Sequence, residues 1–163
     1  TLLYTPAIDD RVESGKIASR IGLEAEALAF DDKFNLYKDV KGKAVQRRIH
    51  CVLIDESQFL TKKQVTEISN IVDKLNIPVL AFGLRTDFQG EPFPGSLYLL
   101  AWADELSEIK TICHCGKRAN HVLRLDDEGN VLKDGDQIAI GGNERYISVC
   151  RKHHKEEMSR STQ

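Results

Sequence analysis

Residues 49–54 read Ile-His-Cys-Val-Leu-Ile, and the next five residues, 55–59, read Asp-Glu-Ser-Gln-Phe. A nearly continuous apolar run of this length is typical of a strand that is buried on both faces of a parallel sheet. The run ends abruptly at two carboxylates, and open α/β sheets bind their ligands at this end of their strands. The stretch therefore predicts a central strand that leads into a functional loop.

On either side of this strand, short β-rich runs alternate with helical patterns over the first hundred residues or so. Residues 1–5 and 77–82 predict further strands, the second one next to the central strand. Residues 61–64 have the spacing of a capping box and begin an apolar stripe that continues to residue 75. A weaker helical pattern covers residues 32–47. The alternation predicts an α/β fold with a mainly parallel sheet flanked by helices.

The second part of the chain has a different pattern. Residues 83–95 contain three glycines and two prolines and predict a long loop. Beyond residue 109, short β-like runs at 121–125, 137–140 and 146–149 alternate with turn signals, and residues 151–158 predict a polar helix. We therefore expect an α/β domain over residues 1–110 and a small β-rich subdomain with a C-terminal helix over residues 111–163.

The amino-acid composition excludes several classes of protein. The chain has 163 residues, of which 41% are hydrophobic and 29% charged, so it has room for one domain with a small appendage and is neither disordered nor fibrous. A net charge of −2 excludes a global basic field for nucleic acid. No apolar stretch approaches the roughly 20 residues of a membrane span, and no signal-peptide pattern opens the chain. We expect a cytoplasmic protein with no membrane partner. Because the first residues already form a strand pattern without a starting methionine, we also expect an earlier segment in the complete polypeptide.

Three cysteines and a histidine form two local pairs, Cys113-His-Cys115 and Cys150-Arg-Lys-His153. Four nitrogen and sulfur ligands satisfy a closed tetrahedral zinc site, which would be structural. The neighbouring His114 and His154 could substitute as ligands. The alternative is that these are free cysteines packed as small hydrophobic side chains. The fourth cysteine, Cys51, falls inside the predicted central strand and is expected to be part of the core.

The acidic pair Asp55 and Glu56 has two interpretations. An acid at a strand end resembles a Walker-B carboxylate, which organises Mg²⁺ around nucleotide phosphates, and a neighbouring glutamate can accept the proton of an attacking hydroxyl. Alternatively, the pair belongs to a solvated loop before a helix. No G-x-x-x-x-G-K-[ST] phosphate loop occurs in the sequence. Residues 14–16, Ser-Gly-Lys, only imitate one, because the required first glycine is Asp10 and Ile17 follows the lysine.

Six motifs occur in order along almost the whole chain: residues 4–11 (Tyr-Thr-Pro-Ala-Ile-Asp-Asp-Arg), 19–22 (Ser-Arg-Ile-Gly), 55–59, 83–88 (Gly-Leu-Arg-Thr-Asp-Phe), 140–143 (Ile-Gly-Gly-Asn) and 146–150 (Tyr-Ile-Ser-Val-Cys). Together with the cysteine and histidine quartet, they resemble the type II thymidine kinase family. That family has a P-loop-type kinase domain and a zinc-binding lasso subdomain. This sequence departs from it at the beginning, where the family's first strand and phosphate-binding loop are absent.

The resemblance implies that the γ-phosphate of ATP is transferred to the 5′-hydroxyl of thymidine, giving dTMP for deoxynucleoside salvage and DNA synthesis. Glu56 would be the general base. The residues implied to bind ATP and Mg²⁺ are Asp55, Glu56, Ser57, Gln58, Asp9 and Arg11; the last two could equally form a surface ion pair. The residues implied to bind the substrate are Phe59, Leu84, Phe88, Phe93, Val122, Gln137, Ile138, Ala139, Ile140, Gly141 and Tyr146. The implied zinc ligands are Cys113, Cys115, Cys150 and His153.

Each group of implied substrate residues also has a plainer interpretation. A flat thymine ring requires apolar walls, which Phe59, Leu84, Phe88 and Phe93 would supply, but the same side chains could simply pack in the core. Val122 would lie beside the thymine methyl group or in the core. The backbone of residues 137–141 would hydrogen-bond the pyrimidine edge, and Gly141 and Gly142 permit a close approach, although they also suit an ordinary β-turn. Arg85 and Arg124 are candidates to offset phosphate charge.

The resemblance also implies partners: thymidine and ATP as ligands, dTTP as a feedback ligand, and a homotetramer, with no nucleic acid. Two rival functions remain open at this point. One is another P-loop NTPase that hydrolyses ATP with Asp55 and Glu56 activating water. The other is a non-enzymatic zinc-binding module that contacts nucleic acid through residues 41–48, against which the net charge of −2 speaks.

Overall fold

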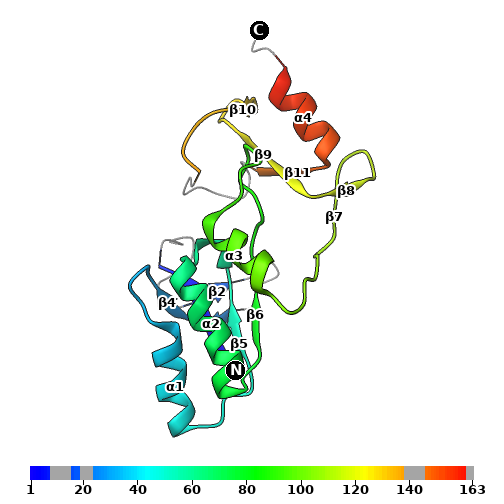
Figure 1. Cartoon of the computed structure of the whole chain (residues 1–163). Coiled ribbons are helices and arrows are strands. Elements are labelled where there is room, and N and C mark those ends of the chain that lie inside the picture. The colour runs from blue at the N-terminus through cyan, green and yellow to red at the C-terminus, as the bar shows by residue number, and fades with distance from the viewer. Residues whose placement is uncertain (8–15, 19–23, 138–145, 161–163) are drawn as a thin grey trace. The chain divides into compact units, whose positions relative to one another are not determined.

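The computed structural model of the chain describes residues 1–7, 16–18, 24–137 and 146–160 (Figure 1). The chain forms two compact units. The first consists of residues 1–85 and 93–104, and the second of residues 86–92 and 105–163. The short segment 86–92 therefore leaves the first unit and folds with the second.

The first unit is built on a parallel sheet of four strands in the order β4 (Leu28–Phe30), β1 (Leu2–Pro6), β5 (Val52–Ile54) and β6 (Val79–Ala81). Val52 of β5 is paired with Leu2 on one side and with Val79 on the other. The prediction of a central strand with β6 as its neighbour is confirmed, and so is the α/β class. The strand is shorter than the apolar run, because Cys51 precedes β5 and is only half-buried.

Three helices accompany this sheet: α1 (Leu36–Gln46), α2 (Lys62–Leu75) and α3 (Pro94–Trp102). Helix α2 packs beside both α1 and α3, as Figure 1 shows. The apolar stripe of α2 lies in the core as predicted. The buried core residues that the helices, the sheet and the connecting loops share are Leu2, Tyr4, Phe30, Leu36, Val40, Ile49, Val52, Ile54, Leu60, Val65, Ile68, Ile71 and Ile77.

Helix α3 was not predicted from the sequence. Its residues are apolar on all sides, and Leu97, Leu100 and Trp102 remain about half exposed, so no amphipathic period marks it as a helix. It begins inside the predicted loop of residues 83–95, with Pro94 in the first turn, a position that suits the fixed backbone angle of proline.

The start of α2 also fixes the start of α1. The predicted capping box is present: the Thr61 hydroxyl accepts from the Gln64 backbone N–H at 3.2 Å, and Gln64 Oε1 accepts from the Thr61 N–H at 3.0 Å. The buried Gln64 side chain then donates from Nε2 to the carbonyl of Asp31 at 2.7 Å and to that of Phe34 at 3.2 Å. One glutamine therefore caps its own helix and satisfies two carbonyls of the loop that leads into α1.

Two short strands of the first unit, β2 (Lys16–Ala18) and β3 (Glu24–Glu26), pair with each other in antiparallel fashion, and a 3₁₀ turn η1 (Ser57–Phe59) follows β5. Among the described helices of both units, none combines the length and the apolar character that crossing a bilayer requires.

The second unit contains a three-stranded antiparallel sheet in the order β10 (Val131–Leu132), β9 (His121–Leu125) and β11 (Tyr146–Val149). A small pair, β7 (Thr111–Ile112) and β8 (Arg118–Ala119), and helix α4 (Arg151–Ser159) complete it. The predicted strands 121–125 and 146–149 and the final helix are confirmed. Of the predicted strand 137–140, Gln137 lies outside any strand, and the rest falls outside the described residues.

The double role of Gln64 gives a stability prediction. We expect Gln64→Ala to lower the free energy of unfolding by about 2 kcal/mol, because it removes a buried amide that donates to two carbonyls of the loop before α1. Gln46→Ala is the matched control, since Gln46 is exposed in the last turn of α1 and should change stability by less than about 0.5 kcal/mol. Urea denaturation of both variants measures the difference. Equal effects at the two positions would contradict the role assigned to Gln64.

Candidate functional site

The candidate site begins where β5 ends, and the backbone there is fixed by the strands on both sides. The Asp55 N–H donates to the carbonyl of Tyr4 in β1 at 2.9 Å, and the Ser57 N–H donates to the carbonyl of Phe82, just after β6, at 2.8 Å. Phe82 in turn donates its N–H to Ile54 at 2.8 Å. The acidic loop is therefore an extension of the sheet ladder and has a defined course.

Glu56 occupies the left-handed region of backbone space, with φ 46° and ψ 42°. A non-glycine residue there costs about 1–2 kcal/mol, and such conformations concentrate at functional sites. The Asp55 carboxylate supports the turn, since its Oδ1 accepts from the Glu56 N–H at 2.9 Å. Nothing in the residue types signals this conformation, so the sequence alone could not predict it.

Gln58 connects the two strand ends. Its side chain is only 2% exposed, its Nε2 donates to Glu56 Oε2 at 2.6 Å, and its Oε1 accepts from the Leu84 N–H at 3.2 Å. Both ends of one buried amide are therefore engaged, one by the candidate base and the other by the chain beyond β6. The sequence indicates Gln58 only as an ATP-binding candidate, because no local pattern reports its contact with Leu84.

Two glycines allow the loop after β6 to pack against η1. A Cβ atom on Gly83 would lie 2.7 Å from both Gln58 Oε1 and the Ser57 hydroxyl. A Cβ on Gly95 would lie 2.6 Å from the Leu60 carbonyl oxygen and 2.7 Å from that of Gln58. Real Cβ atoms do not approach so closely, so both ends of the 83–95 stretch require glycine.

The implied thymine-pocket residues fall into both units. In the first unit, the Phe59 and Phe93 rings meet edge to face with centroids 5.8 Å apart, and Leu84 is 47% exposed. In the second unit, Phe88 is 1% exposed, and the Arg124 guanidinium lies 5.4 Å from its ring centre.

Three other implied residues also lie in the second unit. Gln137 donates from Nε2 to Asp87 Oδ2 at 3.0 Å, while Val122 and Tyr146 are half-buried on neighbouring strands β9 and β11. The remaining predicted residues, Asp9, Arg11 and 138–141, fall outside the described residues.

The second unit brings the four predicted metal ligands together. One ligand atom each from Cys113, Cys115, Cys150 and His153 lies within 4.8 Å of the other three. Cys113 Sγ lies 3.3 Å from His153 Nδ1, and Cys115 Sγ lies 3.9 Å from Cys150 Sγ. Four ligands at about 2.3 Å from a tetrahedral ion are roughly 3.8 Å apart, so the set fits a metal ion of zinc type. This cluster can hold a metal ion.

Of the two alternative histidine ligands, His154 is engaged elsewhere, whereas His114 lies beside the cluster with its Nδ1 3.7 Å from Cys113 Sγ. His154 Nε2 lies 2.7 Å from the carbonyl oxygen of Phe88. His114 stacks on His153, with ring centroids 4.2 Å apart. The Nε2 of His153 faces the Glu156 carboxylate at 3.9 Å, and such an outer carboxylate orients a ligating imidazole.

The ligand cysteines differ in their thiol pKa. Burial opposes ionisation of Cys113, but hydrogen bonds from the backbone of Cys115 and Cys150 and from His153 outweigh it and lower its pKa to about 6. For Cys115, the hydrogen bond from the Lys117 backbone lowers the pKa, but burial and the neighbouring thiols raise it further, so the net shift is upward. Cys113 therefore ionises at lower pH than Cys115, and the thiolate is the form that binds a metal ion.

Known proteins show to which family this sequence belongs. The family model described as thymidine kinase matches residues 1–154. The chain belongs to the thymidine kinase family. It is 60% identical over 156 residues to a thymidine kinase of Mannheimia succiniciproducens, covering 96% of this chain and 80% of that protein.

Two further thymidine kinases are nearly as similar. The one from Vibrio vulnificus is 56% identical, with 98% of this chain and 83% of the relative covered. The one from Haemophilus influenzae is 58% identical, with 96% and 81% covered. Family membership bears out the resemblance of the sequence motifs and makes the protein a nucleoside kinase, a transferase.

The close approach at Gly95 gives a second prediction. Gly95→Ala should destabilise the protein by about 1–3 kcal/mol, because the added methyl group meets backbone carbonyls that cannot rotate away. Gly42→Ala is the control, since a Cβ at this interior position of α1 meets nothing within 4 Å. It should stabilise by about 0.5–1 kcal/mol. Thermal unfolding of both variants tests the opposite signs, and a neutral Gly95→Ala would contradict the packing described.

Proposed function

We propose that this protein transfers the γ-phosphoryl group of ATP to the 5′-hydroxyl of thymidine and releases ADP and dTMP, with Glu56 as the general base. This transfer is the general reaction of the thymidine kinase family. The observation that carries the proposal is the arrangement of Glu56, held at the end of β5 by Asp55 and Gln58. A carboxylate fixed on a rigid strand end is what deprotonation of a bound hydroxyl requires.

In the proposed step, the 5′-oxygen of thymidine forms a bond to the γ-phosphorus while the bond from that phosphorus to the bridging oxygen of ADP breaks. The hydroxyl proton passes to the Glu56 carboxylate. Phosphoryl transfer asks for positioning and charge compensation more than for covalent chemistry by the protein. Gln58 would contribute to positioning, because its N–H on Oε2 restricts how the carboxylate can turn.

We assign the nucleotide side of the site to Asp55, Ser57 and Gln58 at the strand end, with Asp9 and Arg11 from the family motif. Asp55 would be the group that holds Mg²⁺, which neutralises charge on the transferring phosphate when it is bound. Arg85 is exposed one residue after Leu84 and remains a candidate for the same compensation.

For the nucleoside side, we propose that Phe59, Leu84, Phe88 and Phe93 supply apolar walls and that Val122 and Tyr146 contact the base. The backbone of residues 137–141 would recognise the pyrimidine edge. The edge-to-face pair of Phe59 and Phe93 supports this assignment, since the two rings come from η1 and from the end of the glycine-rich loop. Both rings belong to the first unit, and η1 directly follows Glu56.

We propose that the metal in the second unit is zinc and that its role is structural, because four protein ligands leave no open position. The first unit would be the kinase domain and the second the lasso. On the resemblance to the family, we further propose a cytoplasmic homotetramer that binds dTTP as a feedback ligand and has no nucleic-acid partner.

Substitution of the base is the direct test. In the full-length protein, Glu56→Gln should lower kcat by a factor of about 10²–10⁴ while the thymidine dissociation constant stays within about threefold, because the amide keeps the shape but cannot accept the proton. Glu105→Gln serves as the matched control at an exposed position. Thymidine-dependent ADP formation with MgATP gives kcat, and calorimetry gives the dissociation constant.

The same assay separates the rival functions. A Glu56→Gln variant with nearly normal kcat would remove Glu56 from the role of base. ADP formed at the same rate without nucleoside would indicate an ATPase, and salt-dependent DNA binding without any turnover would indicate a nucleic-acid module.

Removal of a metal ligand tests the second unit. Cys150→Ala should reduce bound zinc from one equivalent to well below it and lower the melting temperature, since metal binding contributes directly to folding. Cys51→Ala is the matched control, a half-buried cysteine outside the cluster, and should keep its zinc. Elemental analysis of the purified variants decides, and an unchanged zinc content in Cys150→Ala would contradict the assignment.

A further inference from the structure

Segment 86–92, which carries Phe88, is a turn that is held together from within. The Asp87 carboxylate oxygen Oδ1 accepts from the N–H groups of both Gln89 and Glu91 at 2.9 Å. The Asp87 N–H donates to the Glu91 carbonyl at 2.9 Å, and Gly90 donates back to the Asp87 carbonyl at 3.2 Å. These hydrogen bonds define the conformation of the segment. Other contacts attach it to the rest of the second unit.

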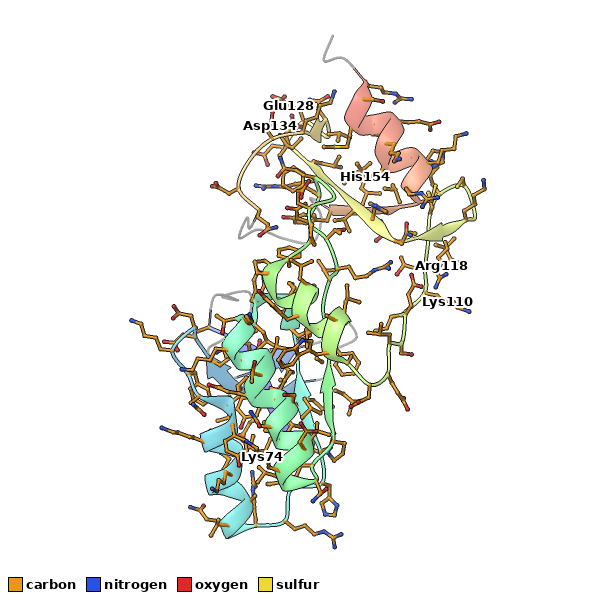
Figure 2. All side chains as sticks on the ribbon, in the orientation of Figure 1. Lys74, Lys110, Arg118, Glu128, Asp134 and His154 are labelled. Carbon is orange, nitrogen blue, oxygen red and sulfur yellow. The ribbon has the colours of Figure 1, made fainter. Side chains whose placement is uncertain are left out.

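A histidine of α4 makes one of the attachments, beside the hydrogen bonds from Gln89 Nε2 to the Lys133 carbonyl at 3.2 Å and from Gln137 Nε2 to Asp87 Oδ2 at 3.0 Å. His154 is 6% exposed, and its Nε2 lies 2.7 Å from the Phe88 carbonyl oxygen. A carbonyl only accepts hydrogen bonds, so Nε2 carries the proton and donates it. A Cβ built on Gly90 would lie 3.5 Å from His154 Cε1, so the turn packs on the imidazole at van der Waals distance. His154 is labelled beside α4 in Figure 2.

The same turn of α4 carries two of the metal ligands. Cys150 is the N-cap residue of α4, and His153 lies in its first turn. The His154 N–H donates to the Cys150 carbonyl at 3.0 Å, so a backbone hydrogen bond joins the residue that holds Phe88 to a ligand residue. A metal ion bound by Cys150 and His153 would therefore also fix the backbone position from which the His154 side chain extends.

We propose that His154 is a positioning residue that couples the metal site to the Phe88 segment. Metal held by Cys150 and His153 fixes the first turn of α4, and the His154 N–H then holds the Phe88 carbonyl in place. In terms of the proposed kinase function, on which this last step rests, metal occupancy and His154 together keep an aromatic wall of the nucleoside site in position.

Hydrogen–deuterium exchange of the zinc-loaded protein tests the attachment without any assay of activity. In His154→Leu, the amides of residues 87–91 should exchange about tenfold faster than in the unsubstituted protein, as expected when one hydrogen bond of ordinary strength is lost. His154→Gln keeps an N–H donor and should recover most of the protection. Lys155→Leu is the control at the next, exposed position of α4 and should exchange normally.

A double-perturbation cycle that combines zinc chelation with His154→Leu tests the coupling to the metal. Chelation of zinc should accelerate the same amides in the unsubstituted protein and add little in His154→Leu, because the two changes break the same chain of contacts. Equal acceleration by chelation in both proteins would overturn the coupling. Unchanged exchange in zinc-retaining His154→Leu would overturn the attachment itself, as would a His154→Gln variant as unprotected as His154→Leu. Where His154→Leu loses its zinc, the unsubstituted protein alone provides the test. Unchanged exchange of residues 87–91 after chelation of its zinc overturns the proposal.

A kinetic readout connects the inference to catalysis. His154→Leu should raise the thymidine KM about tenfold and leave kcat within about twofold, which is the signature of lost uniform binding. A fall in kcat at unchanged KM would contradict a role in positioning the nucleoside wall. Failure of the kinase proposal would remove this readout only, since the exchange experiment does not depend on turnover.

Discussion

A single buried amide, the side chain of Gln58, sets the geometry on which the candidate active site depends. A buried amide group is tolerated only when its hydrogen bonds are satisfied. The Gln58 side chain therefore holds its two hydrogen-bond partners at a fixed separation. One contact is the Glu56 carboxylate, and the other is the backbone of Leu84. Ladder hydrogen bonds set the spacing of β5 and β6, and the Gln58 side chain adds a tie between Glu56 and the backbone beyond β6. Its position also explains the need for glycine at position 83, where a Cβ would lie 2.7 Å from the amide oxygen.

The strained conformation of Glu56 is explained by the same set of contacts. A positive φ at a glutamate persists only where surrounding interactions outweigh its cost. Here the ladder bonds from β1 and from Phe82, the Asp55 carboxylate and the Gln58 amide all act on three consecutive residues. The carboxylate is thereby set in place before any substrate binds, which lowers the cost of reorganisation during the reaction.

The sequence predicted the features that are encoded locally and missed those that depend on distant partners. The apolar run before Asp55, the stripe of α2 and the two ligand pairs of the metal cluster each lie within a few residues of chain, so their periodicity or spacing was informative. The contacts of Gln64 to the loop before α1 join residues about thirty positions apart, and no local pattern reports them. Helix α3 lacks an amphipathic period, and segment 86–92 contacts residues far along the chain, such as Gln137 and His154. The glycines and prolines of residues 83–95 predicted a loop, but they did not indicate to which unit the loop would belong.

The second unit is built from two separate stretches of the chain, which affects how recombination could transfer it to another protein. Because the chain passes between the units three times, near residues 85, 92 and 104, the second unit is not a contiguous stretch of sequence. A fragment starting at residue 105 would keep every metal ligand but leave behind Phe88, the ring under the Arg124 guanidinium and the carbonyl that His154 binds. Transfer of residues 105–163 alone by recombination would therefore separate the metal ligands from the segment that packs on Arg124 and His154. The glycine-rich stretch 83–95 belongs partly to each unit, so an exchange that keeps the second unit whole also has to carry part of this stretch.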